Sequence, residues 1–182
     1  MGDADIGRRA ERLWLWGILA LAATLRLAFL NPYGVLFYDE LFQYVEQAWR
    51  QVSGDGVVTW DIRDHVRPAL LPLLLAVPAR IGLAVGGSAF TAIVAIRLAV
   101  MAASLSAVVA AWSIGRRWSP LHGVLAAAAL AIWYEAIQLG DHVLSESLAV
   151  DAFLAGAALA ASSAGKKRMA MGGLLFGLTA VR

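Results

Sequence analysis

The stretch AFTAIVAIRLAVMAASLSAVVAAWS, residues 89–113, decides the fold class of this chain. Arg97 is its only charged residue, and the stretch is longer than the ~20 apolar residues with which a helix crosses a ~30 Å hydrocarbon core. Further apolar segments lie at 13–30, 121–138, 148–164 and 169–182. We therefore expect an all-α integral membrane protein, folded as a multi-span helical bundle. The last segment is still apolar at its end, so we interpret residues 1–182 as the N-terminal part of a longer polytopic protein, inactive by itself.

The composition supports this class. Of the 182 residues, 60% are hydrophobic and 15% are charged, and the mean hydropathy is +0.70. The net charge is only +2, and the basic residues flank apolar segments, so nucleic acid is not expected as a partner. The absence of cysteine excludes disulfides, thiolate metal sites and a cysteine nucleophile. Together with the high alanine content it favours a bacterial source.

Three basic clusters, at 8–12, 116–117 and 166–168, set the predicted topology. Lys and Arg are enriched in cytoplasmic loops, so we place these clusters in the cytoplasm and residues 31–67 and 139–146 outside. The protein is then a multi-pass protein of the bacterial inner membrane, or of the endoplasmic reticulum if eukaryotic. Its outer loops face the periplasm or the lumen.

The segment 68–85 needs a separate interpretation. The topology requires an odd number of crossings between Arg67 and Arg116, yet two apolar segments lie there. The first, 68–85, contains three prolines and an arginine, which make a poor straight span. We expect it to be re-entrant or interfacial, and 89–113 to be the true span.

The first outer loop contains DELFQYVEQAWRQV, residues 39–52, which predicts an amphipathic helix suited to the membrane interface. Its polar face carries Asp39, Gln43 and Glu46. The adjacent carboxylates of Asp39 and Glu40 either cap the helix or perform chemistry, and both readings stay open on local physics.

Arg97 is the charged residue deepest in a predicted span. Such a residue is costly in a bilayer and indicates function. It either binds the phosphate of a lipid carrier through two hydrogen bonds or pairs with a buried acid such as Asp151 or Glu135. Arg26 lies one turn from the end of its span and is expected to extend toward the interface.

The second outer loop adds Asp141, His142 and Glu146. A divalent metal ion bound by Asp141 and His142 together with Asp39 is an alternative, but one histidine among scattered acids has no spacing typical of a metal site, so we expect no metal cofactor.

Several residues of the first outer loop carry a resemblance to a known family. FYDELFQ at 37–43, Glu46, TWD at 59–61, Arg67 and Pro72 resemble the first outer loop of glycosyltransferase family 22, within the C-type glycosyltransferase superfamily. Phe37 and Tyr38 stand where that family has His-Pro, and Asp61 and Pro68 replace a Glu and a Ser.

The resemblance implies an inverting transfer of a hexose, mannose first, from polyprenyl or dolichyl phosphate to a glycan or glycolipid acceptor on the non-cytoplasmic face. Asp39 matches the general base, with Glu40 beside it as a second catalytic carboxylate. The residues that we expect in substrate binding are Gln43, Glu46, Asp61, Arg67, Arg97 and Glu146, of which Arg97 is expected from its depth in a predicted span.

A transporter or flippase fragment for a lipid-linked or anionic substrate is the alternative. It would use the arginines within the spans as substrate-path residues. Inverted repeats and paired broken helices, which are typical of transporters, are not evident in the sequence.

Overall fold

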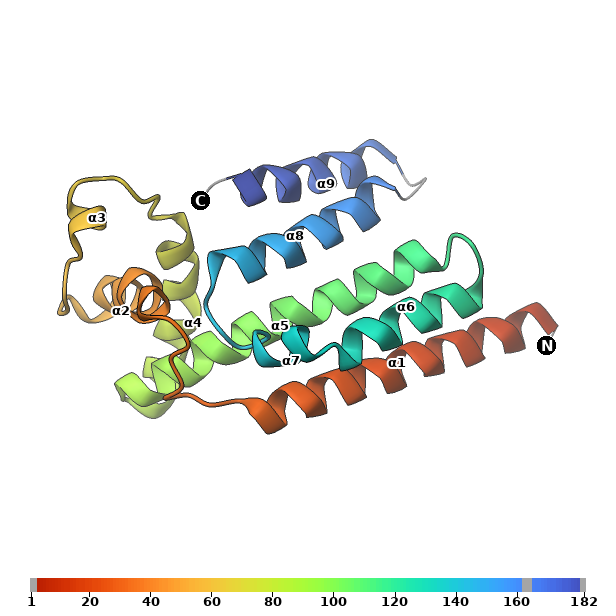
Figure 1. The fold of residues 1–182 in the computed structure, drawn as a ribbon, viewed down its shortest axis with the longest axis horizontal. Coiled ribbons are helices and arrows are strands. Elements are labelled where there is room, and N and C mark those ends of the chain that lie inside the picture. The colour runs from red at the N-terminus through yellow and green to blue at the C-terminus, as the bar shows by residue number, and fades with distance from the viewer. Residues whose placement is uncertain (1–2, 162–164, 181–182) are drawn as a thin grey trace.

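The computed structural model describes residues 3–161 and 165–180, and its regular elements there are all helical (Figure 1). In chain order they are α1 (Asp3–Phe29), the π-helix η1 (Glu40–Val45), α2 (Glu46–Ser53), α3 (Trp60–Arg63), α4 (Leu70–Gly86), α5 (Ala89–Gly115), α6 (Pro120–Ile132), α7 (Tyr134–Gln138), α8 (Ser145–Ala160) and α9 (Gly165–Ala180).

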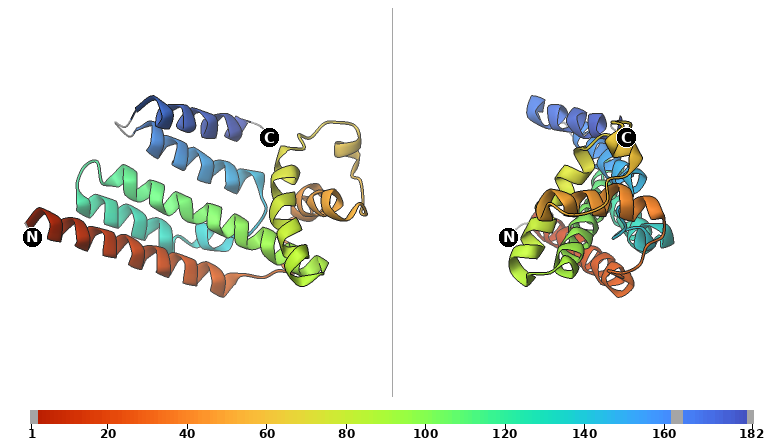
Figure 2. Two further views of the ribbon diagram at one scale, coloured as in Figure 1. Left: turned by 180° about the vertical axis from the view of Figure 1, so that it is seen from behind. Right: turned by 90° about the vertical axis from the view of Figure 1, so that its left-hand side faces the viewer.

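The long helices α1, α5, α6, α8 and α9 run along one another and form a bundle with two distinct ends (Figures 1 and 2). One end holds the start of α1, the α5–α6 connection and the start of α9, and these are the places of the three basic clusters. The opposite end holds residues 30–69 and the α7–α8 connection. The two predicted outer loops therefore meet at one end of the bundle. Which side of the membrane that end faces stays a prediction.

Two described helices are long and apolar enough to cross a membrane. They are Arg9–Phe29, within α1, and the whole of α5. α4 and α6 are apolar but shorter. This agrees with the predicted membrane class, whereas the number of spans stays a prediction.

α4 lies across the end of the bundle rather than along it (Figures 1 and 2). It contains Pro78, and its close packing on α5 depends on Gly82, where a Cβ would lie 2.2 Å from the carbonyl oxygen of Thr91. The turn into α5 is fixed by a capping box in which Ser88 and Thr91 exchange side-chain and backbone hydrogen bonds. This arrangement is compatible with an interfacial or re-entrant element, which stays a proposal for residues 68–85.

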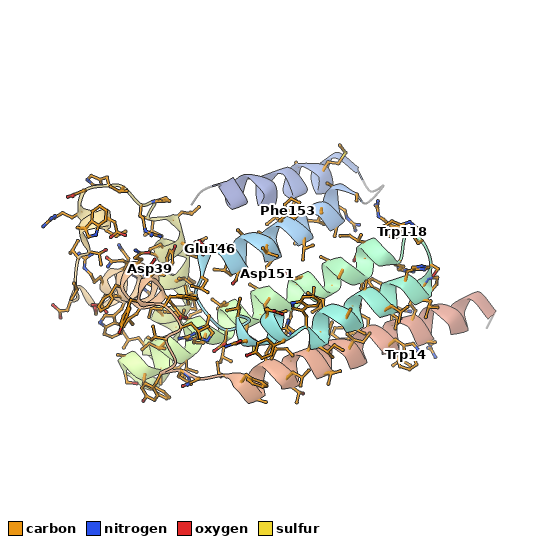
Figure 3. The ribbon with its side chains drawn as sticks, in the orientation of Figure 1. Trp14, Asp39, Trp118, Glu146, Asp151 and Phe153 are labelled. Carbon is orange, nitrogen blue, oxygen red and sulfur yellow. The ribbon has the colours of Figure 1, made fainter. Side chains whose placement is uncertain are left out.

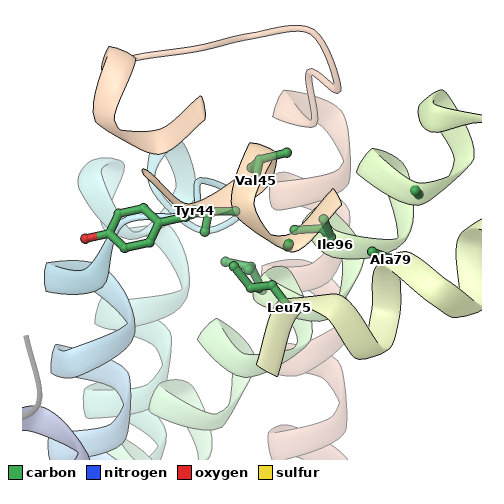
Figure 4. Packing of buried hydrophobic residues seen from close by; sticks show 9 residues of the cluster. Tyr44, Val45, Leu75, Ala79 and Ile96 are labelled. Carbon is green, nitrogen blue, oxygen red and sulfur yellow. The ribbon is translucent and has the colours of Figure 1, made fainter. Parts of the chain in front are cut away.

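A hydrophobic cluster joins the loop helices to the bundle (Figure 4). Its central members are Tyr44, Val45, Leu75, Ala79 and Ile96, from η1, α4 and α5. Burial of large apolar side chains stabilises by about 1.5–3 kcal/mol each relative to exposure to water, so this contact holds the first outer loop in place. A second hydrophobic cluster, in which three of the five buried residues are alanines, joins α1, α5 and α6.

The segment predicted as one amphipathic helix starts as a π-helix. The wider turn of η1 is followed directly by α2, which ends at Gly54 in the left-handed conformation with φ of 81°. Glu40, in η1, and Gln47, in α2, both lie buried. Whether the helix lies in a membrane interface stays a prediction.

Candidate active site

The two adjacent carboxylates of the first outer loop have opposite environments. The side chain of Asp39 is 64% exposed, and that of Glu40 is 1% exposed. Asp39 stands just before η1 and makes no side-chain cap hydrogen bond there. The carboxylate of Asp39 is therefore open to a ligand, whereas that of Glu40 is enclosed by protein.

Glu40 is the acceptor in a buried network that joins three parts of the chain. Its Oε1 lies 2.7 Å from Arg97 Nη1 in α5 and accepts from the backbone N–H of Val143 at 2.9 Å. Its Oε2 lies 2.9 Å from Nδ1 of His142 and also accepts a hydrogen bond from the backbone N–H of Leu36 at 3.4 Å. Glu40 thus connects the first outer loop to the second through partners more than 100 positions later in the chain.

Burial alone would raise the pKa of Glu40, but the hydrogen bond from His142, the charge of Arg97 and a backbone N–H together hold that pKa below its ordinary value. Nδ1 of His142 is 2.9 Å from both Glu40 and Arg97. Because one ring nitrogen carries either a proton or a free lone pair, it donates to Glu40 or accepts from Arg97, not both.

Most of the N–H groups of Arg97 already have hydrogen-bond acceptors. Besides its ion pair with Glu40, it donates from Nη1 to the carbonyl oxygen of Asp141 at 3.2 Å and from Nη2 to that of Gly34. Within the described part of the chain, Nε is the nitrogen left without a partner. The sequence left Asp151 and Glu135 as possible acid partners of Arg97, but the structure pairs it with Glu40.

Asp141 is the least satisfied member of this network. Its side chain is 2% exposed, and one carboxylate oxygen has no hydrogen-bond partner among the described residues. That oxygen lies 3.8 Å from Arg97 Nη1, and the other lies 3.9 Å from Nε2 of His142. Burial raises the pKa of Asp141 despite these two neighbours.

Arg67 supplies the cation nearest to Asp39. Its Nη2 lies 4.0 Å from Asp39 Oδ2, while its Nε donates to Asp61 at 2.9 Å and its Nη1 donates to the Tyr44 hydroxyl at 3.0 Å. Arg67 is 34% exposed, so it remains accessible beside Asp39.

Asp61 fixes the position of the Arg67 guanidinium through the hydrogen bond between them. It is buried, and its burial opposes ionisation, but the hydrogen bond from the Ile62 N–H and the charge and hydrogen bond of Arg67 lower the pKa of Asp61 overall. The structure thus brings together Asp39, Asp61 and Arg67, three residues that the sequence analysis singled out.

Within the described residues, no hydrogen bond or ion pair joins that trio to Gln43, Glu46 or Glu146. Gln43 is half-buried, with a buried side-chain oxygen that has no partner in the described chain. Glu46 accepts from the backbone N–H of Val57 at 2.8 Å and so closes the end of the loop. Glu146 is exposed at the start of α8, at the same end of the bundle as Asp39 (Figure 3).

Sequence reasoning missed Tyr44 and His142 as parts of this site. Tyr44 was hard to find because nothing in the helical pattern of 39–52 places its hydroxyl beside Arg67, which comes 23 positions later in the chain. His142 was considered only as a metal ligand. No group of three or more His, Asp or Glu side chains suited to a metal ion occurs in the residues that the structure describes, and the absence of a metal cofactor stays a prediction.

Comparison with known proteins gives one match. The sequence model of the Alg9-like mannosyltransferase family matches residues 14–180, which include both outer loops and most of the bundle. A search of curated proteins and a search of solved structures each return no match.

Proposed function

Because the chain belongs to the Alg9-like mannosyltransferase family, we propose that it moves a mannosyl group from polyprenyl phosphate to a hydroxyl group of a glycan or glycolipid acceptor. The reaction takes place at the end of the bundle that carries both outer loops. That end faces the periplasm or the lumen, and the transfer inverts the anomeric centre.

Asp39 is the general base in this proposal. The observation that carries it is the contrast within the acidic pair: Asp39 is 64% exposed, whereas Glu40 is enclosed and bound by Arg97. Asp39 takes the proton of the acceptor hydroxyl as its oxygen attacks the anomeric carbon. The bond from that carbon to the phosphate oxygen breaks at the same time, and both electrons leave with the phosphate.

Arg67 stabilises the departing phosphate. Phosphate leaves as an anion, so it needs a cation rather than an acid as its partner. The hydrogen bonds to Asp61 and Tyr44 hold the Arg67 guanidinium beside Asp39 before substrate arrives. A group fixed in advance avoids reorganisation during the reaction.

Glu40 and Arg97 act as positioning residues in this proposal. Their network fixes the start of η1, and Asp39 immediately precedes it. A buried arginine already occupied by Glu40, His142 and two backbone carbonyls has little capacity left for a phosphate.

The test compares transfer from polyprenyl-phosphate mannose by the full-length gene product and by its Asp39→Asn variant, in membranes and at equal protein level. Loss of a general base costs on the order of 10²–10⁴-fold in rate, so transfer should fall by at least ~100-fold. Asp55→Asn is the matched control, since Asp55 is an exposed acid of the same loop.

Transfer by Asp39→Asn within about threefold of wild type would refute Asp39 as the base, because removal of a true base costs at least ~100-fold. If wild type transfers from no lipid-linked sugar, the proposed function fails, and transport of a lipid-linked substrate is then the activity to measure.

A further inference from the structure

A cavity of about 330 Å³ lies within the bundle and outside the Asp39–Arg67 site. Residues of α1, α5, α6, α7 and α8 line it, and they do not include Asp39, Glu40 or Arg67. Most of the lining is apolar, with Arg26, Ser104 and Asp151 among its polar members. The volume is at the lower end of the range of about 300–1,000 Å³ found for small-molecule sites, which suits one sugar ring rather than an oligosaccharide.

Arg26 is built into the wall of this cavity. It is 1% exposed, and it donates from Nε to Ser104 at 3.0 Å and from Nη1 to the carbonyl oxygen of Ala22 at 3.2 Å. Its Nη2 makes no hydrogen bond within the part of the chain that the structure describes. Gly140 leaves the necessary room, because a Cβ there would lie 3.0 Å from Arg26 Nε. A protein-buried arginine in the last turn of α1 that keeps a donor free toward a cavity indicates a ligand.

The charges of the cavity select against an anion. Asp151 faces the same space and interacts electrostatically with Arg26, although the two form no direct ion pair. Glu135 and Glu146 add two exposed carboxylates to the lining. The lining thus carries three carboxylates and one guanidinium, and its excess of negative charge would repel a phosphate.

The same groups suit a neutral polyhydroxyl ligand. Carboxylates accept hydrogen bonds from hydroxyl groups, and the guanidinium donates to hydroxyl oxygens. Trp133, which is 58% exposed and also lines the cavity, offers a flat apolar surface for the C–H face of a sugar ring. Glu146 begins α8 at the bundle end that carries Asp39, with Asp151 further along the helix (Figure 3).

We propose that this cavity is a saccharide subsite that holds one neutral hexose ring, with Trp133 beneath the ring and Glu146, Asp151 and Arg26 on its hydroxyl groups. The ring belongs either to the lipid-linked donor or to the acceptor glycan, since both present the same chemistry. The inference rests on the proposed function for its substrate class, but binding to the cavity is measurable without turnover.

The first experiment measures binding of methyl α-mannoside to the full chain in lipid nanodiscs by saturation-transfer NMR, with inorganic phosphate as competitor. We expect the mannoside to bind, and we expect that phosphate does not displace it. Trp133→Ala and Glu146→Gln should each weaken the affinity for the mannoside at least tenfold. Trp118→Ala is the matched control, because Trp118 is an exposed tryptophan at the opposite end of the bundle (Figure 3).

Mannoside binding that neither Trp133→Ala nor Glu146→Gln alters would overturn the proposal, provided that both variants melt as wild type does. Displacement of the mannoside by phosphate would also overturn it, and would make the cavity a site for an anionic head group.

The second experiment separates the two sources of the ring and the two proposals. Trp133→Ala should raise KM at least tenfold for the donor or for the acceptor, with kcat nearly unchanged, and the affected substrate identifies the source. Asp39→Asn should lose transfer yet keep mannoside binding. If wild type binds mannoside through Trp133 but transfers nothing, the proposed function fails and the subsite stands. If transfer proceeds and Trp133→Ala changes neither KM, the subsite fails and the proposed function stands.

Discussion

Replacement of Glu40 by glutamine tests the buried network at the base of the outer loops. Glu40→Gln keeps the size of the side chain but removes its charge and places an NH₂ group among the donors of Arg97, His142 and Val143. Removing one partner of a buried ion pair costs about 3–5 kcal/mol, because the other charge is left uncompensated. In a chain of this size 1 kcal/mol corresponds to about 2–4 °C in Tm, so the variant should melt about 6–20 °C below wild type.

The assay is thermal unfolding of the purified protein in detergent, followed by tryptophan fluorescence. Asp39→Asn serves as the control, since its side chain is 64% exposed and its nearest cation, Arg67, is 4.0 Å away. An exposed pair of that kind contributes only about 0–1 kcal/mol.

The double variant Glu40→Gln/Arg97→Met should recover part of the lost stability, because it removes the uncompensated charge as well. A Tm for Glu40→Gln within about 2 °C of wild type would refute the reasoning, because loss of one partner of a buried pair should cost at least ~3 kcal/mol. A decrease in Tm for Asp39→Asn as large as that for Glu40→Gln would also refute the reasoning.

Two further predictions concern stability. Burial raises the pKa of Asp141, although the charges of His142 and Arg97 oppose the rise, so its ionised form destabilises the fold above that pKa. Asp141→Asn should therefore raise Tm at pH 8. This gain in Tm should shrink as the pH falls toward about 3.9, the pKa of an aspartate in the unfolded chain. A lower Tm than wild type at every pH would contradict the prediction. Gly82→Ala should destabilise by about 1–3 kcal/mol, since its Cβ would lie 2.2 Å from a backbone oxygen of α5. Gly17→Ala is the control and should not destabilise the protein, because nothing lies within 4 Å of a Cβ at that position. Equal decreases in Tm for the two variants would count against the close α4–α5 packing.

Much of the fold class follows from local sequence alone. The length and apolarity of residues 89–113 predict a helix of membrane-crossing length, and α5 occupies Ala89–Gly115. The prolines of 68–85 make that segment distinct from its neighbours, and the structure lays α4 across the bundle end. The motif of the first outer loop was enough to identify the family, which the match over 14–180 confirms.

The site required the tertiary structure. Asp39 and Glu40 are neighbours with the same chemistry, so no local pattern could decide which of them faces a ligand. Glu40 is buried among partners that come from α5 and from residues 142–143, and the latter are more than 100 positions away in the chain.

The sequence by itself determined the class of the chain, its family and the loop that carries the acids, because apolar length and short motifs are properties of contiguous residues. Only the tertiary structure decided that Glu40 is the partner of Arg97, that Arg67 stands beside Asp39, and that Arg26 faces a cavity with Asp151. The physical reason is that the burial of a charged group depends on which distant groups compensate it, and that compensation exists only once the helices have packed.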